Sequence, residues 1–299
     1  MKNLFVLAIL ALAFLAPLNA EAASRFWVGG TGTWDSSSTT HWAATSGGSS
    51  GASVPGASDD VTFDANSGGG TVTVNFGGTV SINTLTLSAF TGTLDFSANN
   101  NNVTINASSG GSGFNNSGSG TRTLNLGNGT WTMAGSDCLW NQTGATNLTF
   151  NANSSTVVLA GNGNRNFAGG AFTYNVVSFS AGSSSVGSEA NFSGGVTVGT
   201  LNIAAPNFFR AGTTSNAITT LNVTGTSSSS LVMIQSSSTT AAAPLAVTNN
   251  FTPSWVGIAN VTFSVGTHTA SNSFAFKGVT GITVTPPSSG GGGGRIIGG

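Results

Sequence analysis

Apolar residues recur two positions apart along most of the chain, with Thr or Asn between them. Because the side chains of a β-strand alternate between its two faces, this spacing predicts short strands that bury one face and expose a polar one. Six copies open on Thr or Asn, and they begin at Thr84, Thr123, Asn147, Thr200, Thr220 and Asn260. Looser copies lie between them at 103–105, 177–179, 245–247 and 282–284.

The copies follow one another at a mean interval of about 22 residues, and a unit of that length cannot bury its apolar face alone. We therefore predict an all-β fold, a parallel β-helix or β-solenoid of about ten rungs of roughly 22 residues, in which neighbouring rungs complete one another's core. An antiparallel β-sandwich is the alternative arrangement for strands with this alternation.

Four parts of the chain are expected. Residues 1–22 have the features of a signal peptide, namely Lys2, a short apolar run and a small-x-small cleavage site at residues 20–22. Residues 23–69 hold three of the six tryptophans, and we interpret them as an N-terminal cap over the first rung, since a stack of strands exposes its end. Residues 70–285 are predicted to form the solenoid repeats, and the Gly-rich residues 286–299 a flexible tail.

Charge is scarce in this chain. Charged residues make up 5% of it and the net charge is -1, so no field is present to attract nucleic acid or an anionic membrane surface. We therefore expect no nucleic-acid partner, and no later segment predicts a membrane span. Cys138 is the single cysteine, which excludes an internal disulfide, and its sequence surroundings predict a small buried hydrophobe.

Two groups of residues carry a resemblance to known proteins. Trp34-Asp35, Trp42, Val54-Pro55 and the run 59–63 resemble the opening of β-strand repeat units in autotransporter passengers and related secreted bacterial proteins. The tracts 114–118, 124–131 and 167–170 are similar to repeats of predicted phage tail and environmental surface proteins. The resemblance implies a β-solenoid with a display, adhesive or structural role, and it transfers no catalytic residue.

A calcium site is one candidate chemistry. Asp60, Thr62 and Asp64 alternate onto one face of a short predicted strand, and carboxylates with nearby carbonyls are the ligands that Ca²⁺ prefers. In the alternative interpretation, Asp59 and Asp60 cap one turn and Asp64 starts the next. No other cofactor is expected.

Sugar binding is the second candidate. Trp27, Trp34 and Trp42 could offer flat faces to sugar rings, or could instead pack together in the cap. No catalytic residue is predicted: the G-x-S-x-G match at 47–51 lacks the strand and the helix that a nucleophile elbow needs, and the acids outside the cap come from different rungs.

These observations predict a non-enzymatic protein, secreted or displayed on a cell or virion surface, with a structural or adhesive role, including that of a phage tail or surface-attachment component. A carbohydrate-binding or polysaccharide-degrading β-helix protein is the alternative. The expected partner is a surface glycan or a protein, and self-association, for example as a trimer, stays open.

Overall fold

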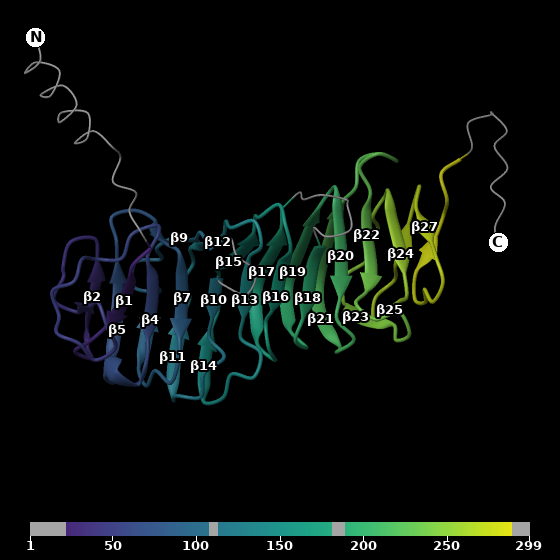
Figure 1. Cartoon of the computed structure of the whole chain (residues 1–299). Coiled ribbons are helices and arrows are strands. Elements are labelled where there is room, and N and C mark those ends of the chain that lie inside the picture. Colours follow the sequence, from purple (N-terminus) through teal and green to yellow (C-terminus); the bar gives the residue numbers. More distant parts are fainter. Residues whose placement is uncertain (1–21, 108–112, 181–188, 289–299) are drawn as a thin grey trace, which may run out of the picture.

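The computed structural model describes residues 22–107, 113–180 and 189–288, so the predicted signal peptide and most of the predicted tail lie outside the described residues. The described chain is all-β, as predicted. It forms strands β1 to β28 and one short 3-10 helix, η1 (Ala65–Ser67). Most strands belong to three sheets that run along an elongated body, with β2 near one end and β27 near the other (Figure 1).

We name the three sheets A, B and C. Sheet A has twelve strands in the order β3 (Trp42–Ala43), β1 (Ser24–Trp27), β4 (Asp60–Phe63), β7 (Thr84–Leu87), β10 (Gly113–Asn115), β13 (Leu139–Asn141), β16 (Arg165–Ala168), β18 (Glu189–Ser193), β20 (Asn207–Ala211), β22 (Val232–Ser236), β24 (Val256–Ala259) and β27 (Phe274–Ala275). Sheet B has five, β2 (Gly32–Asp35), β5 (Thr71–Asn75), β8 (Thr93–Asp95), β11 (Arg122–Asn125) and β14 (Leu148–Asn151).

Sheet C has nine strands, β6 (Val80–Ile82), β9 (Val103–Ile105), β12 (Thr130–Met133), β15 (Thr156–Leu159), β17 (Thr173–Phe179), β19 (Thr197–Ala204), β21 (Asn216–Thr224), β23 (Ala243–Val247) and β25 (Val261–Ser264). A separate pair, β26 (Thr269–Ala270) and β28 (Thr283–Val284), lies near the C-terminal end.

From β4 onwards, consecutive strands belong to different sheets. The chain passes from β4 in sheet A to β5 in sheet B and β6 in sheet C, and then returns to sheet A as β7, which pairs with β4 in parallel. Among the pairings of the described strands, only that of β1 with β3 is antiparallel. This winding is compatible with a β-solenoid, and it shows that the alternative of an antiparallel sandwich is wrong.

The cross-section changes along the stack because sheet B ends at β14. From there on, the longer strands β17, β19 and β21 of sheet C occupy the position of sheet B as well as that of sheet C. Residues Val176–Phe179 of β17 pair with β15, whereas the first two residues of β17 extend beyond β15 and pair only with β19. The ring of Tyr174 in this leading part lies 5.0 Å from that of Phe150 in β14.

The repeat motifs do not form a single column. Leu85 lies in sheet A, Val103 in sheet C, and Leu124 and Leu148 in sheet B, whereas the copies from Val177 to Val261 all lie in sheet C. Side-chain hydrogen bonds between adjacent coils join residues at unequal separations, for example 20 positions for Asn202 with Asn222 and 30 for Asp95 with Asn125. The mean interval read from the sequence therefore mixes the spacing between coils with the spacing between sheets of one coil.

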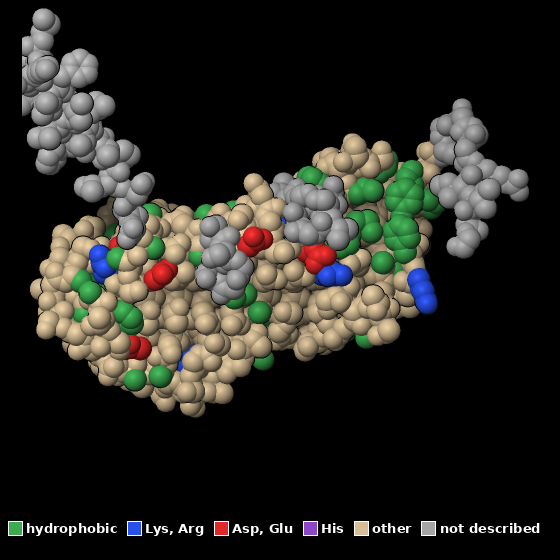
Figure 2. All heavy atoms as spheres, in the orientation of Figure 1, with side chains coloured by type: hydrophobic (Ala, Val, Ile, Leu, Met, Phe, Trp, Pro, Cys, Tyr) green, Lys and Arg blue, Asp and Glu red, His purple; other side chains and the backbone are tan. Residues whose placement is uncertain are grey.

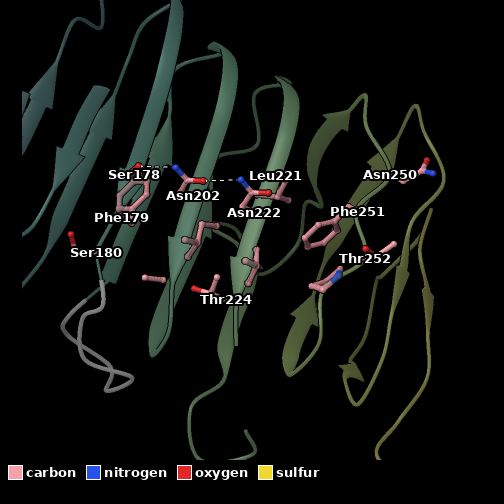
Figure 3. Close-up of a pocket in the computed structure, with 14 residues that line it drawn as sticks. Ser178, Phe179, Ser180, Asn202, Leu221, Asn222, Thr224, Asn250, Phe251 and Thr252 are labelled. Carbon is pink, nitrogen blue, oxygen red and sulfur yellow. Dashed lines mark hydrogen bonds between the residues drawn. The ribbon is translucent and has the colours of Figure 1, made fainter. Parts of the chain in front are cut away.

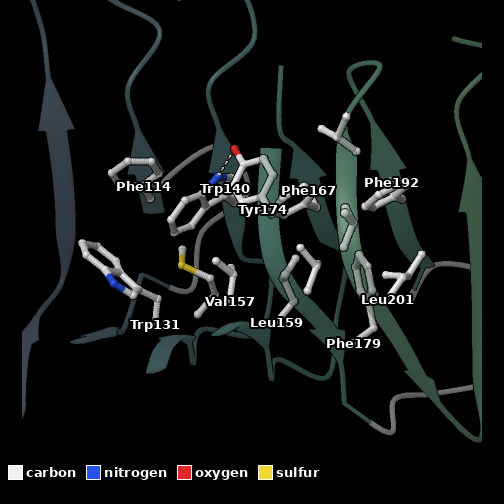
Figure 4. Close-up of a cluster of buried hydrophobic side chains, with 14 of the residues drawn as sticks. Phe114, Trp131, Trp140, Val157, Leu159, Phe167, Tyr174, Phe179, Phe192 and Leu201 are labelled. Atoms are coloured by element: carbon white, nitrogen blue, oxygen red, sulfur yellow. Dashed lines mark hydrogen bonds between the residues drawn. The ribbon is translucent and has the colours of Figure 1, made fainter. Parts of the chain in front are cut away.

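Alternation places the large apolar side chains inside. In sheet A, Phe114 is aligned with Trp140, Trp140 with Phe167, and Phe167 with Phe192. Their rings stack along the axis: the ring centroids of Trp140 and Phe167 are 6.2 Å apart and those of Phe167 and Phe192 5.5 Å (Figure 4). Each such side chain, once fully buried, contributes about 1.5–3 kcal/mol, so this column is a main source of stability.

Candidate functional site

A row of uncharged polar side chains crosses the outer face of sheet C. Parallel register aligns Ser178 of β17, Asn202 of β19 and Asn222 of β21. The amide nitrogen of Asn202 donates to Ser178 Oγ at 3.0 Å, and that of Asn222 donates to Asn202 Oδ1 at 2.9 Å (Figure 3). Because an amide both donates and accepts, each coil can extend such a row by one residue.

The row ends at β21 for a structural reason. Strand β23 pairs only with Asn216–Ile218, at the start of β21. The backbone N–H of Asn249 still donates to the carbonyl of Thr219, but the chain then turns inward at Phe251, whose side chain is 2% exposed. Within the part of the chain that the structure describes, no strand pairs with the following edge of β21 from Leu221 onwards.

A groove of about 610 Å³ lies at this break. One wall carries the polar row and the end of β21, and the other is formed by residues 250–253 (Figure 3). Its lining side chains are hydroxyls, amides and apolar groups, and none of them is ionisable. The groove can therefore offer hydrogen bonds to a neutral polar partner, and the strand edge can pair with an extended segment.

The two carboxylates of the predicted calcium site are not brought together. Asp60 Oδ1 accepts hydrogen bonds from Asn83 Nδ2 at 2.8 Å and from Thr84 Oγ1 at 2.7 Å. Asp64 Oδ1 accepts from the backbone N–H of Asn66 at 2.9 Å and begins η1. Four residues of extended strand hold the two Cα atoms about 13 Å apart.

Asp64 makes the contacts of the turn-capping alternative, whereas Asp60 is bonded to two side chains of the next coil and caps no turn. Asp59 likewise accepts from the backbone N–H groups of Ala23 at 3.1 Å and Gly56 at 2.9 Å. Among the described residues, no group of three or more His, Cys, Asp or Glu side chains is placed to hold a metal. We expect a melting temperature that a calcium chelator leaves unchanged.

The three N-terminal tryptophans are packed against one another. Trp27, Trp34 and Trp42 are all 0% exposed, and the ring centroid of Trp42 lies 5.2 Å from each of the other two. His41 stacks on Trp27 at 4.6 Å. Because no indole face is accessible, the geometry favours the packing interpretation over the sugar platform.

The remaining acids and the cysteine serve separate structural contacts. Asp95 accepts from Ser97, Asp137 accepts from the backbone of Asn164, and Glu189 pairs with Arg210, so these acids do not converge. The Cys138 side chain is buried, as predicted, and burial raises the pKa of its thiol to about 11, which keeps it protonated at neutral pH.

Sequence reasoning missed a buried polar network. Arg122 Nε donates to Asn116 Oδ1 at 2.6 Å, Asn116 Nδ2 donates to Gln142 Oε1 at 2.9 Å, and Gln142 Nε2 donates to the Tyr174 hydroxyl. The Trp140 indole N–H donates to the same hydroxyl at 3.1 Å (Figure 4). No spacing rule predicts this network, because it depends on which coils become neighbours.

Comparison with protein-family models, with curated proteins and with solved structures finds no match for this chain. In the described residues, no helix has the length and apolar character needed to cross a membrane. What the chain does must therefore be inferred from its own surfaces.

Proposed function

We propose that the protein is a secreted or surface-displayed structural and adhesive β-solenoid that is not an enzyme. The observation that supports this role is the set of uncharged rows on the outer faces. The pairs Asn125 with Asn151 and Asn202 with Asn222 bridge adjacent coils through amide hydrogen bonds of 2.7 and 2.9 Å.

Such rows suit adhesion because they repeat. Parallel coils follow one another every 4.8 Å or so, so a flat polar partner meets many weak hydrogen-bonding groups at once. Figure 2 shows one face that is mostly uncharged and polar, with few Lys, Arg, Asp or Glu side chains. Contacts made by amides and hydroxyls do not depend on salt, in contrast to those made by charges.

We further propose that the stack comprises about ten rungs of roughly 22 residues, with residues 23–69 as its cap. The placement of β3 supports the cap: it lies at the end of sheet A and pairs Trp42 with Trp27 of β1 in antiparallel orientation. A short antiparallel strand at this position covers an edge that would otherwise pair with another chain.

Export, by the predicted signal peptide, places this rod on a cell surface or free outside the cell. Assembly into a phage tail is the variant of the same proposal, since a tail also needs an uncharged rigid rod. The partner in either setting is a surface glycan or a protein. Both variants require a chain that stays elongated in solution.

The test combines shape with adhesion. Small-angle scattering of the chain from residue 23 onwards should give an elongated particle, and beads coated with it should adhere to glycan-coated or protein-coated surfaces equally at low and high salt. The double variant in which Asn202 and Asn222 are both changed to Ala should weaken adhesion. Thr149→Ala, at an exposed position of β14 in sheet B, is the surface control. A globular scattering profile, or beads that adhere to neither surface, would refute the proposal.

A further inference from the structure

The outer face of sheet A changes character towards its C-terminal end. Parallel register aligns Phe208 of β20 with Met233 of β22, Met233 with Gly257 of β24, and Gly257 with Phe274 of β27. These positions point outward, and Phe208, Met233 and Phe274 are each partly exposed. Figure 2 shows hydrophobic side chains gathered on this part of the face, while most of the surface towards the N-terminal end is uncharged and polar.

A groove of about 530 Å³ lies beside this apolar strip. We call it the C-terminal groove, and its lining includes Arg210, Gln235, Ser238, Thr240, Phe276 and Lys277. Its volume is within the usual range of small-ligand sites, about 300–1,000 Å³.

Positive charge is concentrated in the C-terminal groove. Arg122 and Arg165 are buried elsewhere, whereas Arg210 and Lys277 both line this groove. Arg210 uses Nη1 for an ion pair with Glu189 at 2.8 Å, and this is the one ion pair among the described residues. Within the described residues, Lys277 forms no ion pair, so its ammonium group can pair with an anion, whereas Arg210 can contribute only while it stays bonded to Glu189.

An exposed aromatic ring lines the same groove. The Phe276 side chain is 55% exposed, and only Val265 is an equally prominent large hydrophobic on the described surface. The absence of a side chain at Gly257 makes room for Met233, since a Cβ there would lie 2.3 Å from its sulfur and 3.5 Å from the Phe276 ring. Met233 and the Phe276 ring thus both lie over Gly257.

We propose that the C-terminal groove binds an acidic oligosaccharide. The face of Phe276 packs against the apolar C–H face of a sugar ring, Lys277 and Arg210 pair with a carboxylate, and Gln235 hydrogen-bonds to hydroxyl groups. This proposal goes beyond the adhesive role of the uncharged rows and does not rest on it, because it concerns another face and another chemistry.

An acidic peptide is the competing ligand class. A peptide backbone is best held by a free sheet edge. Strands β22 and β24 are paired on both sides, and the end strand β27 has only two residues, which is too short an edge to hold an extended peptide. The amide and hydroxyl groups of Gln235, Ser238 and Thr240 instead match the many hydroxyl groups of a sugar. These features favour the oligosaccharide.

Calorimetric titration of the chain from residue 23 onwards tests the ligand class. The probes are a galacturonic acid oligosaccharide, the same oligosaccharide after reduction of its carboxyl groups, and a glutamate peptide of equal charge. We expect the acidic oligosaccharide to bind, the reduced form to bind about three- to tenfold more weakly, and the acidic form to weaken as salt rises. No binding of the acidic oligosaccharide, or equally tight binding of the peptide, would overturn the proposal.

Surface variants test the site itself. Phe276→Ala should weaken binding about three- to tenfold, and Lys277→Gln should abolish much of the preference for the acidic form. The matched controls are Val265→Ala, which truncates the other exposed hydrophobic, and Arg25→Gln, which removes an exposed cation near the opposite end. If the control variants weaken binding as much as the groove variants do, this groove is not the binding site. Bead adhesion measured on the same variants should not change, so failure here is distinguishable from failure of the adhesive role.

Discussion

Replacing Tyr174 with Phe removes one oxygen atom from the interior of the stack and leaves the aromatic ring in place. The side chain is 1% exposed. Its hydroxyl accepts from Trp140 Nε1 at 3.1 Å and from Gln142 Nε2, and it donates to the carbonyl of Gly169 at 2.9 Å. The variant therefore leaves two buried donors and one buried acceptor without that partner.

The expected cost follows from the groups left behind. An unsatisfied buried polar group costs about 1–3 kcal/mol, whereas the apolar area of the ring is unchanged. In the variant, Gln142 Oε1 still accepts the hydrogen bond from Asn116 Nδ2, and this bond limits how far the network rearranges. We expect Tyr174→Phe to lower the free energy of unfolding by about 3 kcal/mol, a large share of the 5–15 kcal/mol typical of a domain.

Urea unfolding followed by tryptophan fluorescence measures this loss, and the slope of the transition shows whether the stack still unfolds as one unit. The matched control is Thr149→Val, which also removes a single hydroxyl but from an exposed position of β14. It should change the free energy of unfolding by no more than about 0.5 kcal/mol. If Tyr174→Phe stays within the same limit at an unchanged slope, the network does not hold the coils together and the reasoning is refuted.

Three further results are expected. Burial raises the pKa of the Cys138 thiol from 9.0 to about 11, so the folded state keeps a proton that the unfolded chain loses above pH 9. The free energy of unfolding should therefore fall as pH rises from about 9 towards 11, by up to about 1.4 kcal/mol per pH unit. Urea unfolding at several pH values should show a smaller fall for Cys138→Ala. Arg165 is buried, forms no ion pair within the described residues, and donates to Asn207 Oδ1 at 2.9 Å. Asn207→Leu leaves a buried charge without this partner and should cost about 3–5 kcal/mol in urea unfolding. Arg165→Met removes the charge but leaves the Asn207 oxygen without a donor, so it should cost less, about 1–3 kcal/mol. The described residues contain a single ion pair, Glu189 with Arg210, so the melting temperature should be nearly the same at low and high sodium chloride concentrations. A large shift would show that charges contribute more to stability than this one ion pair implies.

The sequence was sufficient to predict strand faces but not sheet membership. Two-residue alternation shows that Leu85 and Val103 point inward, and both are buried. It does not show that they belong to different sheets of the same coil, because all three sheets of a coil use the same alternation. The overall class was therefore predictable, whereas the repeat register was not.

The candidate sites were harder to predict for a related reason. Trp27 and Asp60 were chosen by residue type, yet one is fully buried and the other accepts hydrogen bonds from the next coil. The C-terminal groove joins Arg210, Gln235 and Phe276 only because register aligns Arg210 with Gln235 in sheet A and Phe276 directly follows β27 of the same sheet. Sequence separation hides such a column until the size of each coil is known.

The scarcity of charge has a physical origin in the stacking itself. In a parallel stack each outward side chain lies about 4.8 Å from its counterpart in the next coil, so like charges in one column would repel one another, whereas amides can donate to and accept from their own kind. Asn202 over Asn222 satisfies this requirement. Stacking therefore favours uncharged rows, which adhesion can then use, but it gives no reason for Arg210 and Lys277 to line one groove with an exposed Phe276. The charged side chains that depart from this preference for uncharged columns therefore point to the C-terminal groove as a ligand site.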